Sequence, residues 1–212
     1  MGYEAFVFDL DDTLVNTSMV VSSVMESWCE ENGIDFFEAS RASLGTRTQD
    51  TVAQVAPHLD APSEAKKIEE REAAALAALR PISGAHDLLN ALPSARWAIV
   101  TSSSLFLAKA KLAKAGLPIP QVIVSAECVT KGKPDPEPYV LAAELLGCRP
   151  ESCLVFEDAD SGVKSALSAG CNVFVIGSIC TVKAGGIVGR AVDYSKLKVT
   201  NSGPLKIRHA HV

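Results

Sequence analysis

Five short apolar segments recur along this chain, and stretches of helical character separate them. Each segment is rich in Val, Ile or Phe, which is typical of strands buried on both faces of a sheet. The segments are Ala5 to Phe8, Trp97 to Val100, Val122 to Val124, Cys153 to Phe156 and Val173 to Ile176. Predicted helices lie between them at Ala85 to Leu92, Leu105 to Ala115, Pro136 to Leu146 and Gly162 to Ala169. This alternation predicts right-handed βαβ crossovers, and therefore an α/β fold with a Rossmann-like parallel sheet.

The connection after the first segment differs from the others. Residues Val15 to Arg80 separate it from the next α/β unit and look almost wholly helical, ending in the Ala-rich stretch Glu64 to Leu79. The sequence therefore predicts a small helical cap, residues 15–82, inserted into an α/β core formed by residues 1–14 and 83–212.

Composition argues against several classes of protein. With 212 residues, of which 48% are hydrophobic and 21% charged, the chain can bury a substantial core. A net charge of -5 and the lack of a long basic run argue against a nucleic-acid partner. Six cysteines without a CxxC pair suit reduced thiols, and no apolar stretch has membrane-spanning length. We therefore expect a cytoplasmic protein with no nucleic-acid or membrane partner, either a monomer or a weak dimer.

Three carboxylates follow the first predicted strand, in the segment Phe8-Asp9-Leu10-Asp11-Asp12-Thr13-Leu14. Strand alternation points Asp9 and Asp11 to the same side, so their negative charges would repel each other in a small space. A bound cation would relieve this repulsion, and a hard divalent ion of the magnesium type takes oxygen ligands of this kind. A solvated acidic turn explains the same residues, since short acidic motifs recur by chance.

Polar residues also follow the other predicted strands. Thr101-Ser102-Ser103-Ser104 supplies hydroxyl and backbone N–H groups before a helix, and Lys133 lies in a loop shaped by glycine and prolines. The segment Glu157-Asp158-Ala159-Asp160 follows the fourth strand. Taken singly, these features have simpler explanations, namely a helix N-cap, a solvated lysine and a second cap.

The carboxyl ends of parallel strands meet at one edge of a sheet, where open α/β folds bind their ligands. Residues distant in the sequence would converge there and combine acids for a metal ion with hydroxyl and ammonium groups for an anion. These residues are Asp9, Asp11, Thr101, Lys133, Glu157 and Asp158. The sequence therefore predicts a site that handles phosphate.

The order of these motifs resembles that of the haloacid dehalogenase-like hydrolase superfamily. An Asp-x-Asp-x-Thr motif comes first (Asp9, Asp11, Thr13), and a strand-end Thr, a Gly-Lys-Pro loop and a terminal acidic pair follow. The loop Gly132 to Tyr139 and the segment Glu157-Asp158-Ala159 look like the beta-phosphoglucomutase-type group, and its sugar and glycerol phosphatases are the closest match. The resemblance covers roughly Tyr3 to Gly177.

The resemblance implies roles for the acidic residues. Asp9 would be the nucleophile that forms an aspartyl-phosphate, and Asp11 the general acid and base. Mg²⁺ would bind a side-chain oxygen of Asp9, the backbone carbonyl of Asp11, and Asp158. Glu157 would belong to the same metal site, supporting its waters or its geometry.

Other residues would bind the substrate. By the same resemblance, Thr101 and Lys133 would hold the transferring phosphoryl group, with Thr13 and Ser102 as further phosphate or substrate contacts. In the predicted cap, the segment Gly45 to Asp50 looks like the loop that contacts substrate in the sugar-phosphate group. Gly45 and Arg47 are therefore predicted substrate contacts. A helix-connecting turn with a solvated Arg47 is the alternative.

Two features fall outside the family pattern. Asp12 stands where this superfamily often has glycine, so the turn carries an additional carboxylate. The tail from Cys180 onward has little family signal, and its His209-Ala210-His211 ending suggests a metal site. We reject that site because a pair of histidines at a chain terminus is usually solvated.

The leading prediction is a Mg²⁺-dependent phosphatase that hydrolyses a small phosphorylated sugar or polyol through an aspartyl-phosphate. A beta-phosphoglucomutase-type mutase would use the same residues and return the phosphate to a sugar instead of passing it to water. A phosphorylatable signalling switch is an alternative from another class. The order of motifs argues against the switch, because the second acidic site follows Thr101 and Lys133 instead of preceding them.

Overall fold

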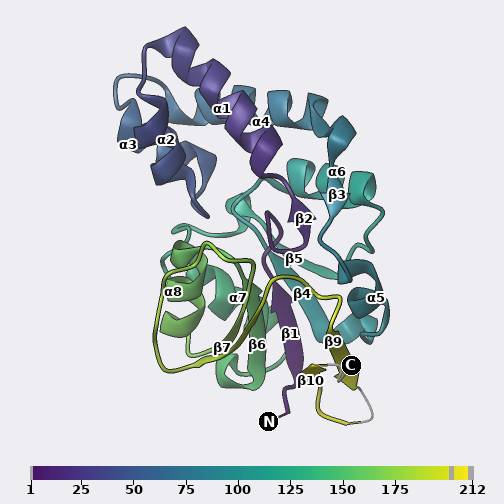
Figure 1. The fold of residues 1–212 in the computed structure, drawn as a ribbon. Coiled ribbons are helices and arrows are strands. Elements are labelled where there is room, and N and C mark those ends of the chain that lie inside the picture. Colours follow the sequence, from purple (N-terminus) through teal and green to yellow (C-terminus); the bar gives the residue numbers. More distant parts are fainter. Residues whose placement is uncertain (1, 201–202, 210–212) are drawn as a thin grey trace.

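A six-stranded parallel sheet forms the centre of the molecule (Figure 1). The structure, a computed structural model, describes residues 2–200 and 203–209. The strand order is β5-β4-β1-β6-β7-β8, and each pair of neighbours is parallel. The strands are β1 (Ala5–Phe8), β4 (Trp97–Val100), β5 (Val122–Val124), β6 (Cys153–Glu157), β7 (Asn172–Ile176) and β8 (Ile187–Ala191). The predicted α/β fold with a Rossmann-like sheet is confirmed.

Helices follow the strands at the predicted places. They are α5 (Ala85–Asn90), α6 (Leu105–Ala115), α7 (Glu137–Leu145) and α8 (Asp160–Ser168). Helix α6 covers the predicted range, and its start and end have clear local causes. The Ser104 side chain accepts a hydrogen bond from the N–H of Leu107, and Gly116 adopts the left-handed conformation typical of a C-cap.

The side chains of β1 alternate between two hydrophobic clusters, one on each face of the sheet. Phe6 and Phe8 pack in the cluster that includes α5 and α6, whereas Ala5 and Val7 pack in the cluster that includes α7 and α8. Helices therefore cover both faces, which explains why the central strands are continuous apolar runs.

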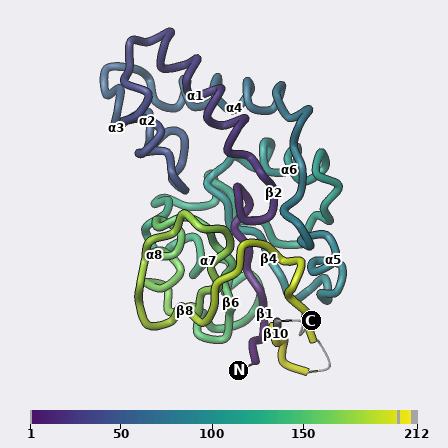
Figure 2. The backbone as a smooth tube through the Cα atoms, in the orientation of Figure 1, coloured from purple at the N-terminus to yellow at the C-terminus, as the bar shows by residue number. Residues whose placement is uncertain are grey.

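Four helices are inserted between β1 and the rest of the sheet. They are α1 (Ser18–Asn32), α2 (Phe36–Ser43), α3 (Thr48–Val55) and α4 (Ala61–Ala74), followed by the 3₁₀ turn η1 (Leu76–Ala78). These helices share a hydrophobic cluster that contains Trp28, Val52 and Ile68. The chain enters through β2 (Val15–Asn16) and leaves through β3 (Arg80–Pro81), which pair with each other. The backbone trace shows this helical insertion over the end of the sheet at which β1 ends (Figure 2).

The C-terminal region adds elements that the sequence did not predict. Strand β8 extends the sheet beside β7, and β9 (Leu197–Thr200) pairs antiparallel with β10 (Lys206–His209). Tyr194, between β8 and β9, is buried against the rings of Phe8 and Phe156. His209 lies in β10, whereas His211 lies outside the described residues.

All six cysteines are free, and four of them are buried: Cys29, Cys153, Cys171 and Cys180. This state agrees with the predicted reduced thiols. Among the described residues, no helix combines the length and apolar character needed to cross a membrane.

Candidate active site

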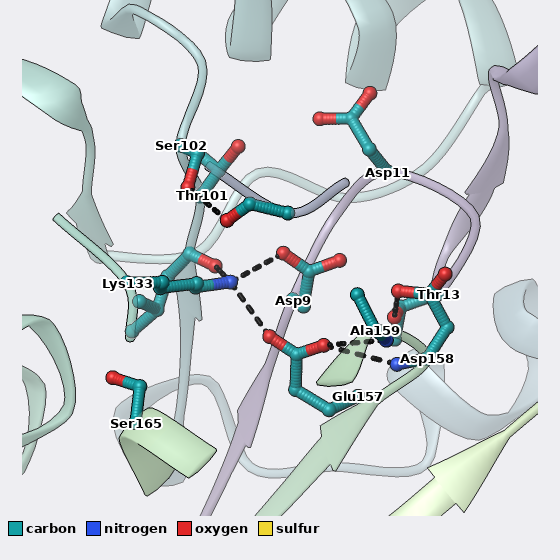
Figure 3. Close-up of polar contacts among 12 residues, drawn as sticks. Asp9, Asp11, Thr13, Thr101, Ser102, Lys133, Glu157, Asp158, Ala159 and Ser165 are labelled. Carbon is teal, nitrogen blue, oxygen red and sulfur yellow. Dashed lines mark hydrogen bonds and ion pairs between the residues drawn. The ribbon is translucent and has the colours of Figure 1, made fainter. Parts of the chain in front are cut away.

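The carboxyl ends of β4, β1 and β6 lie side by side in the sheet and carry the predicted polar residues (Figure 3). Asp9 follows β1, Thr101 follows β4, and Glu157 ends β6 immediately before Asp158. Lys133 reaches the same point from the loop between β5 and α7. All five residues are buried. The fold therefore brings together side chains that are far apart in the sequence.

Lys133 joins two of these carboxylates. Its Nζ donates to Asp9 Oδ1 at 2.6 Å, to Glu157 Oε1 at 2.7 Å and to the carbonyl of Val100 at 3.2 Å. Burial would lower the pKa of Lys133, but the charges of Asp9 and Glu157 raise it above its ordinary value. The ammonium group therefore stays charged, and these three bonds use its three protons.

Both oxygens of Glu157 have hydrogen-bond donors. Oε1 also accepts from the Tyr139 hydroxyl at 2.7 Å, and Oε2 accepts from the backbone N–H groups of Asp158 at 3.0 Å and Ala159 at 3.2 Å. A Cβ atom at Gly162 would lie 1.6 Å from Oε1, so the first turn of α8 also confines this carboxylate. Glu157 is thus fixed, and it orients Lys133.

Asp9, Glu157 and Asp158 form a group of carboxylates whose oxygens lie within 4.8 Å of one another. Burial and the charges of Asp9 and Glu157 raise the pKa of Asp158 to about 9. Burial, opposed in part by Lys133, raises the pKa of Asp9 to about 7. Thr13 donates to Asp158 Oδ1 at 3.2 Å and so orients it. Since one lysine does not neutralise three carboxylates, the group suits a cation with oxygen ligands.

Asp11 comes from the same loop as Asp9, but its carboxylate points away from Asp9 and Lys133 (Figure 3). Lys111 Nζ donates to Asp11 Oδ1 at 2.6 Å, and Ser103 Oγ donates to Oδ2 at 3.1 Å. Burial would raise the pKa of Asp11, but the Lys111 ammonium lowers it below its ordinary value. Lys111 also pairs with Glu72 of α4 at 3.2 Å, so ion pairs connect Asp11 to the insertion.

The hydroxyl groups after β4 have separate partners. Thr101 Oγ1 accepts from the N–H of Ser103 at 3.1 Å, and Ser102 Oγ donates to the carbonyl of Gly45 at 2.9 Å. Ser104 is the N-cap of α6, so the N-cap explanation of the segment Thr101 to Ser104 is correct for this residue. Thr101 and Ser102 do not cap the helix and lie at the edge of the sheet (Figure 3).

Asp12 has a structural role that explains the departure from glycine. Its φ of 57° lies in the left-handed region, which aspartate tolerates better than most residues. Its carboxylate accepts from the N–H groups of Thr17 at 2.9 Å and Ser18 at 3.1 Å. Asp12 therefore binds the backbone at the start of α1.

The loop between α2 and α3 lies against the edge of the sheet. The carbonyl of Leu44 accepts from Ser161 Oγ at 2.8 Å, and that of Gly45 accepts from Ser102. A Cβ atom at Gly45, whose φ is 71°, would lie 2.3 Å from Ser161 Oγ. Glycine therefore allows this close approach between the insertion and the core.

Arg47 is buried in the same loop. Its Nε donates to Asp50 at 2.7 Å, and its Nη1 donates to the carbonyl of Val129 at 3.2 Å. The alternative prediction of a solvated Arg47 is therefore wrong. Its charge is paired with Asp50, and its guanidinium bridges the insertion and the core.

A cavity of about 360 Å³ borders the carboxylates. Asp9, Asp11 and Asp158 line it from the core, and α1, α2 and the Gly45 loop line it from the insertion. A second cavity of about 500 Å³ lies between the insertion and the start of α6, and Arg47 lines this one. Ser102 borders both cavities.

A family model described as haloacid dehalogenase-like hydrolase matches residues 6–176. This range contains every side chain of the carboxylate and lysine cluster. The chain belongs to the haloacid dehalogenase-like hydrolases. The predicted resemblance is therefore confirmed.

This hydrolase is similar to curated phosphatases. It is 38% identical over 181 residues to hexitol phosphatase A of Escherichia coli (strain K12), which covers 83% of this chain and 84% of the relative. It is 33% identical over 188 residues to 2-deoxyglucose-6-phosphate phosphatase 2 of Saccharomyces cerevisiae, covering 77% of this chain and 76% of the relative.

Among solved structures, CbbY from Rhodobacter sphaeroides in complex with phosphate has a TM-score of 0.77 and 25% identity, covering 92% of this chain and 96% of the other. The chain is a phosphoric monoester hydrolase, as the sequence predicted, and not a signalling switch.

Sequence reasoning missed two partners of the predicted residues in this hydrolase, namely Lys111 and Glu72. It named Tyr139 only as the end of the loop Gly132 to Tyr139, without its contact to Glu157. Lys111 lies on the helical face that also carries Leu107 and Ala108. A lysine at a position that the helical period assigns to the core signals a buried ion pair. Glu72 carries the same signal, because it lies on the face of α4 that also carries Ala65 and Ile68, but the helical period does not show that Lys111 is its partner.

Proposed function

We propose that this hydrolase is a Mg²⁺-dependent phosphatase that acts on a small phosphorylated sugar or polyol through an aspartyl-phosphate intermediate. The observation that carries the proposal is the position of Asp9. It borders the cavity while Lys133 holds its Oδ1 atom, and its second oxygen, Oδ2, is turned away from Lys133 (Figure 3). Oδ2 is therefore suited to act as the nucleophile.

The reaction has two phosphoryl-transfer steps. In the first, Asp9 Oδ2 forms a bond to phosphorus and the ester P–O bond breaks. Asp11, which Lys111 keeps ionised in the free site, would have to take up a proton when the substrate binds, and it then gives this proton to the departing alcohol oxygen. In the second, Asp11 takes a proton from a water molecule that attacks phosphorus, and the bond to Asp9 breaks. Phosphate leaves and both carboxylates return to their starting state. Asp11 lines the same cavity as Asp9, as these roles require.

The acidic group at the sheet edge has the donors that Mg²⁺ prefers. Asp9 and Asp158 would each supply a side-chain oxygen, and the backbone carbonyl of Asp11 would supply another. Glu157 uses both oxygens for hydrogen bonds, so we assign it to supporting this group through Lys133. When bound, the ion would withdraw negative charge from the phosphoryl oxygens.

The remaining predicted residues would bind or orient. Thr101 would contact the transferring phosphoryl group, and Lys133 would stabilise that group by its charge while it stays bonded to Asp9, because charge stabilisation at this point is a large part of catalysis. Ser102 borders the cavity and would contact the substrate. Thr13, predicted as a phosphate or substrate contact, donates to Asp158, so we assign it to orienting that carboxylate.

The helical insertion would act as a cap over the cavity. We divide the chain into a core of residues 1–14 and 83–212 and a cap of residues 15–82. In support, Ile82 N donates to the carbonyl of Leu14 at 2.8 Å, so the two proposed boundaries are adjacent. A cap at this position excludes water from the reaction and contributes its own residues around the leaving group. Gly45 would be one of these, whereas Arg47 would brace the loop.

The names of the relatives support the substrate class and favour a phosphatase over a mutase. Hexitol phosphatase A and 2-deoxyglucose-6-phosphate phosphatase 2 are both named for phosphate removal from sugar or polyol esters. We therefore propose water as the acceptor of the phosphoryl group from Asp9.

A panel of phosphorylated metabolites tests this function. We expect Mg²⁺-dependent phosphate release from sugar or polyol monophosphates, and its loss on chelation of the metal. Asp9→Asn and Asp11→Asn should each nearly abolish turnover while the circular dichroism spectrum stays that of the wild type. Isomerisation of a sugar phosphate without phosphate release would instead identify a mutase, and retained hydrolysis by Asp9→Asn would exclude the proposed nucleophile.

A further inference from the structure

The wall that the insertion contributes to the 360 Å³ cavity is rich in hydroxyl groups. The hydroxyl-bearing residues of the insertion that line it are Thr17, Ser18, Ser22, Ser40, Ser43, Thr46, Thr48 and Thr51. The hydroxyl groups of Ser18, Ser43 and Thr46 already donate to acceptors within the protein, but a hydroxyl oxygen that donates can still accept. The wall therefore matches the alcohol groups of a sugar or polyol. Val21, Met25, Phe36 and Leu44 add apolar surface to the same wall, against which the C–H groups of such a molecule can pack.

Positive charge at the cavity is already paired. Lys111 is the one basic side chain among the described residues that line it, and it contacts Asp11 at 2.6 Å and Glu72 at 3.2 Å. Lys133 is buried between Asp9 and Glu157. Neither lysine can serve a second anion in the leaving group without giving up a buried carboxylate, which is costly.

Arg47 is the other cation close to this region, and its position excludes the same role. Its guanidinium makes two hydrogen bonds to Asp50, at 2.7 and 3.0 Å. It lines the neighbouring 500 Å³ cavity and packs against Gly132, where a Cβ atom would lie 2.8 Å from Arg47 Nε. The loop thus brings an arginine to the edge of the sheet without presenting its charge to the leaving group.

Negative charge, in contrast, is in excess. Five carboxylates line the cavity, from Asp9, Asp11, Asp12, Glu72 and Asp158. When a divalent ion is bound and the five carboxylates are ionised, the ion and Lys111 would still leave the lining with net negative charge before the phosphoryl group enters. A second anionic group on the substrate would be desolvated in this negative field, which opposes its binding.

From this arrangement we propose that the site selects monophosphate esters whose leaving group is an uncharged polyol or sugar, and that it rejects sugar bisphosphates and phosphorylated sugar acids. The inference rests on the proposed phosphatase function and defines its substrate class. It also bears on the acceptor, because a mutase that returns the phosphoryl group to a sugar phosphate passes through a bisphosphate. A cavity that rejects a second phosphate therefore favours water.

A matched pair of substrates tests the selection. Sorbitol 6-phosphate and 6-phosphogluconate share their carbon skeleton and ester, and differ at C1, where a carboxylate replaces a hydroxymethyl group. With Mg²⁺ in excess, we expect kcat/KM for phosphate release to be at least about 100-fold higher for sorbitol 6-phosphate. Equal values for the two esters would overturn the inference.

A substitution that adds a positive charge to the cavity wall tests whether the insertion is responsible for the selection of uncharged leaving groups. Ser22 and Ser23 are exposed neighbours on α1, but only Ser22 lines the cavity. Ser22→Arg should raise kcat/KM for 6-phosphogluconate relative to sorbitol 6-phosphate by at least about tenfold, because it adds a cation beside the leaving group. Ser23→Arg makes the same change in net charge outside the cavity and should leave the ratio unchanged. Equal ratios in the two variants would contradict the assigned role of this wall.

The same assays separate this inference from the proposed function. If the protein hydrolyses both esters equally well, it is a phosphatase without the proposed selection. If it releases phosphate from neither ester and from no neutral sugar phosphate, the phosphatase function fails, and the substrate class fails with it.

Discussion

The position of the proposed nucleophile depends on a short series of contacts that begins at a glycine. Gly162 leaves space for the carboxylate of Glu157, Glu157 holds the ammonium of Lys133 at 2.7 Å, and Lys133 holds Asp9 at 2.6 Å. Each member is buried, so none can move without displacing its neighbour. Gly162, which would not contact the substrate, thus controls the position of Asp9, the proposed nucleophile.

Substitution of Gly162 tests this series. In Gly162→Ala the new Cβ atom would lie 1.6 Å from Glu157 Oε1, so the carboxylate must shift and carry Lys133 with it. We expect kcat/KM to fall by about 10²-fold, as displacements of roughly 1 Å typically cause in active sites. Gly185→Ala is the control, because no atom lies within 4 Å of its added Cβ. Wild-type kcat/KM in folded Gly162→Ala would show that Glu157 does not position Lys133.

For single residues, the sequence was informative where a polar residue comes after a predicted strand. Asp9, Lys133 and Asp158 could be predicted because parallel strands end at one edge and the motif order fixes which residues meet there. The pairing of Lys111 with Glu72 could not, because it depends on where α4 packs against α6. Asp12 shows a third case, since its left-handed backbone and its contacts to α1 appear only in three dimensions.

Between elements, the insertion is held to the core by buried charge as well as by loop contacts. Helix α4 contributes Glu72 and helix α6 contributes Lys111, which also holds Asp11 of the β1 loop. Burial would lower the pKa of Lys111, but the charges of Asp11 and Glu72 raise it above its ordinary value. One lysine therefore joins a helix of the insertion, a helix of the core and the proposed acid-base residue.

Removal of this lysine should destabilise the fold. Lys111→Met keeps the aliphatic length but leaves Asp11 and Glu72 without their shared cation, so we expect unfolding free energy to fall by about 3–5 kcal/mol. Adding Glu72→Gln removes one of the two uncompensated charges and should recover part of the loss. Urea unfolding of the wild type, the two single variants and the double variant measures this coupling. Additive effects would mean that the two side chains do not stabilise one another.

Strands could be predicted where their sequence is a continuous apolar run. Strands β1, β4 and β5 match their predicted ranges for this reason, although β5 lies at one edge of the sheet. Strand β8, at the other edge, was missed because Gly189 and Arg190 interrupt its apolar sequence. The two-residue strands β2 and β3 have no recognisable sequence pattern, because each is a strand only through its pairing with the other.

For the whole molecule, the unusual feature is the cluster of buried carboxylates that borders the cavity between the sheet and the helical insertion. Asp158 has a pKa of about 9 and Asp9 a pKa of about 7, both above their ordinary value of 3.8. Between pH 4 and 9 the folded protein therefore binds more protons than the unfolded chain at these two groups. Its stability without metal must fall as pH rises through this range.

Magnesium should reverse part of this loss, because it binds the ionised carboxylates of the folded state. At pH 6 protons compete for Asp9 and Asp158, whereas at pH 8 Asp9 is largely ionised and less work is needed to deprotonate Asp158. We therefore expect the rise in thermal unfolding midpoint caused by a fixed Mg²⁺ concentration to be larger at pH 8 than at pH 6. Asp158→Asn removes one proposed ligand and one raised pKa, so it should flatten the pH dependence without metal and largely abolish the Mg²⁺ shift. An equal Mg²⁺ shift at both pH values in the wild type would mean that these carboxylates do not bind the ion, and the buried charge would then need another explanation.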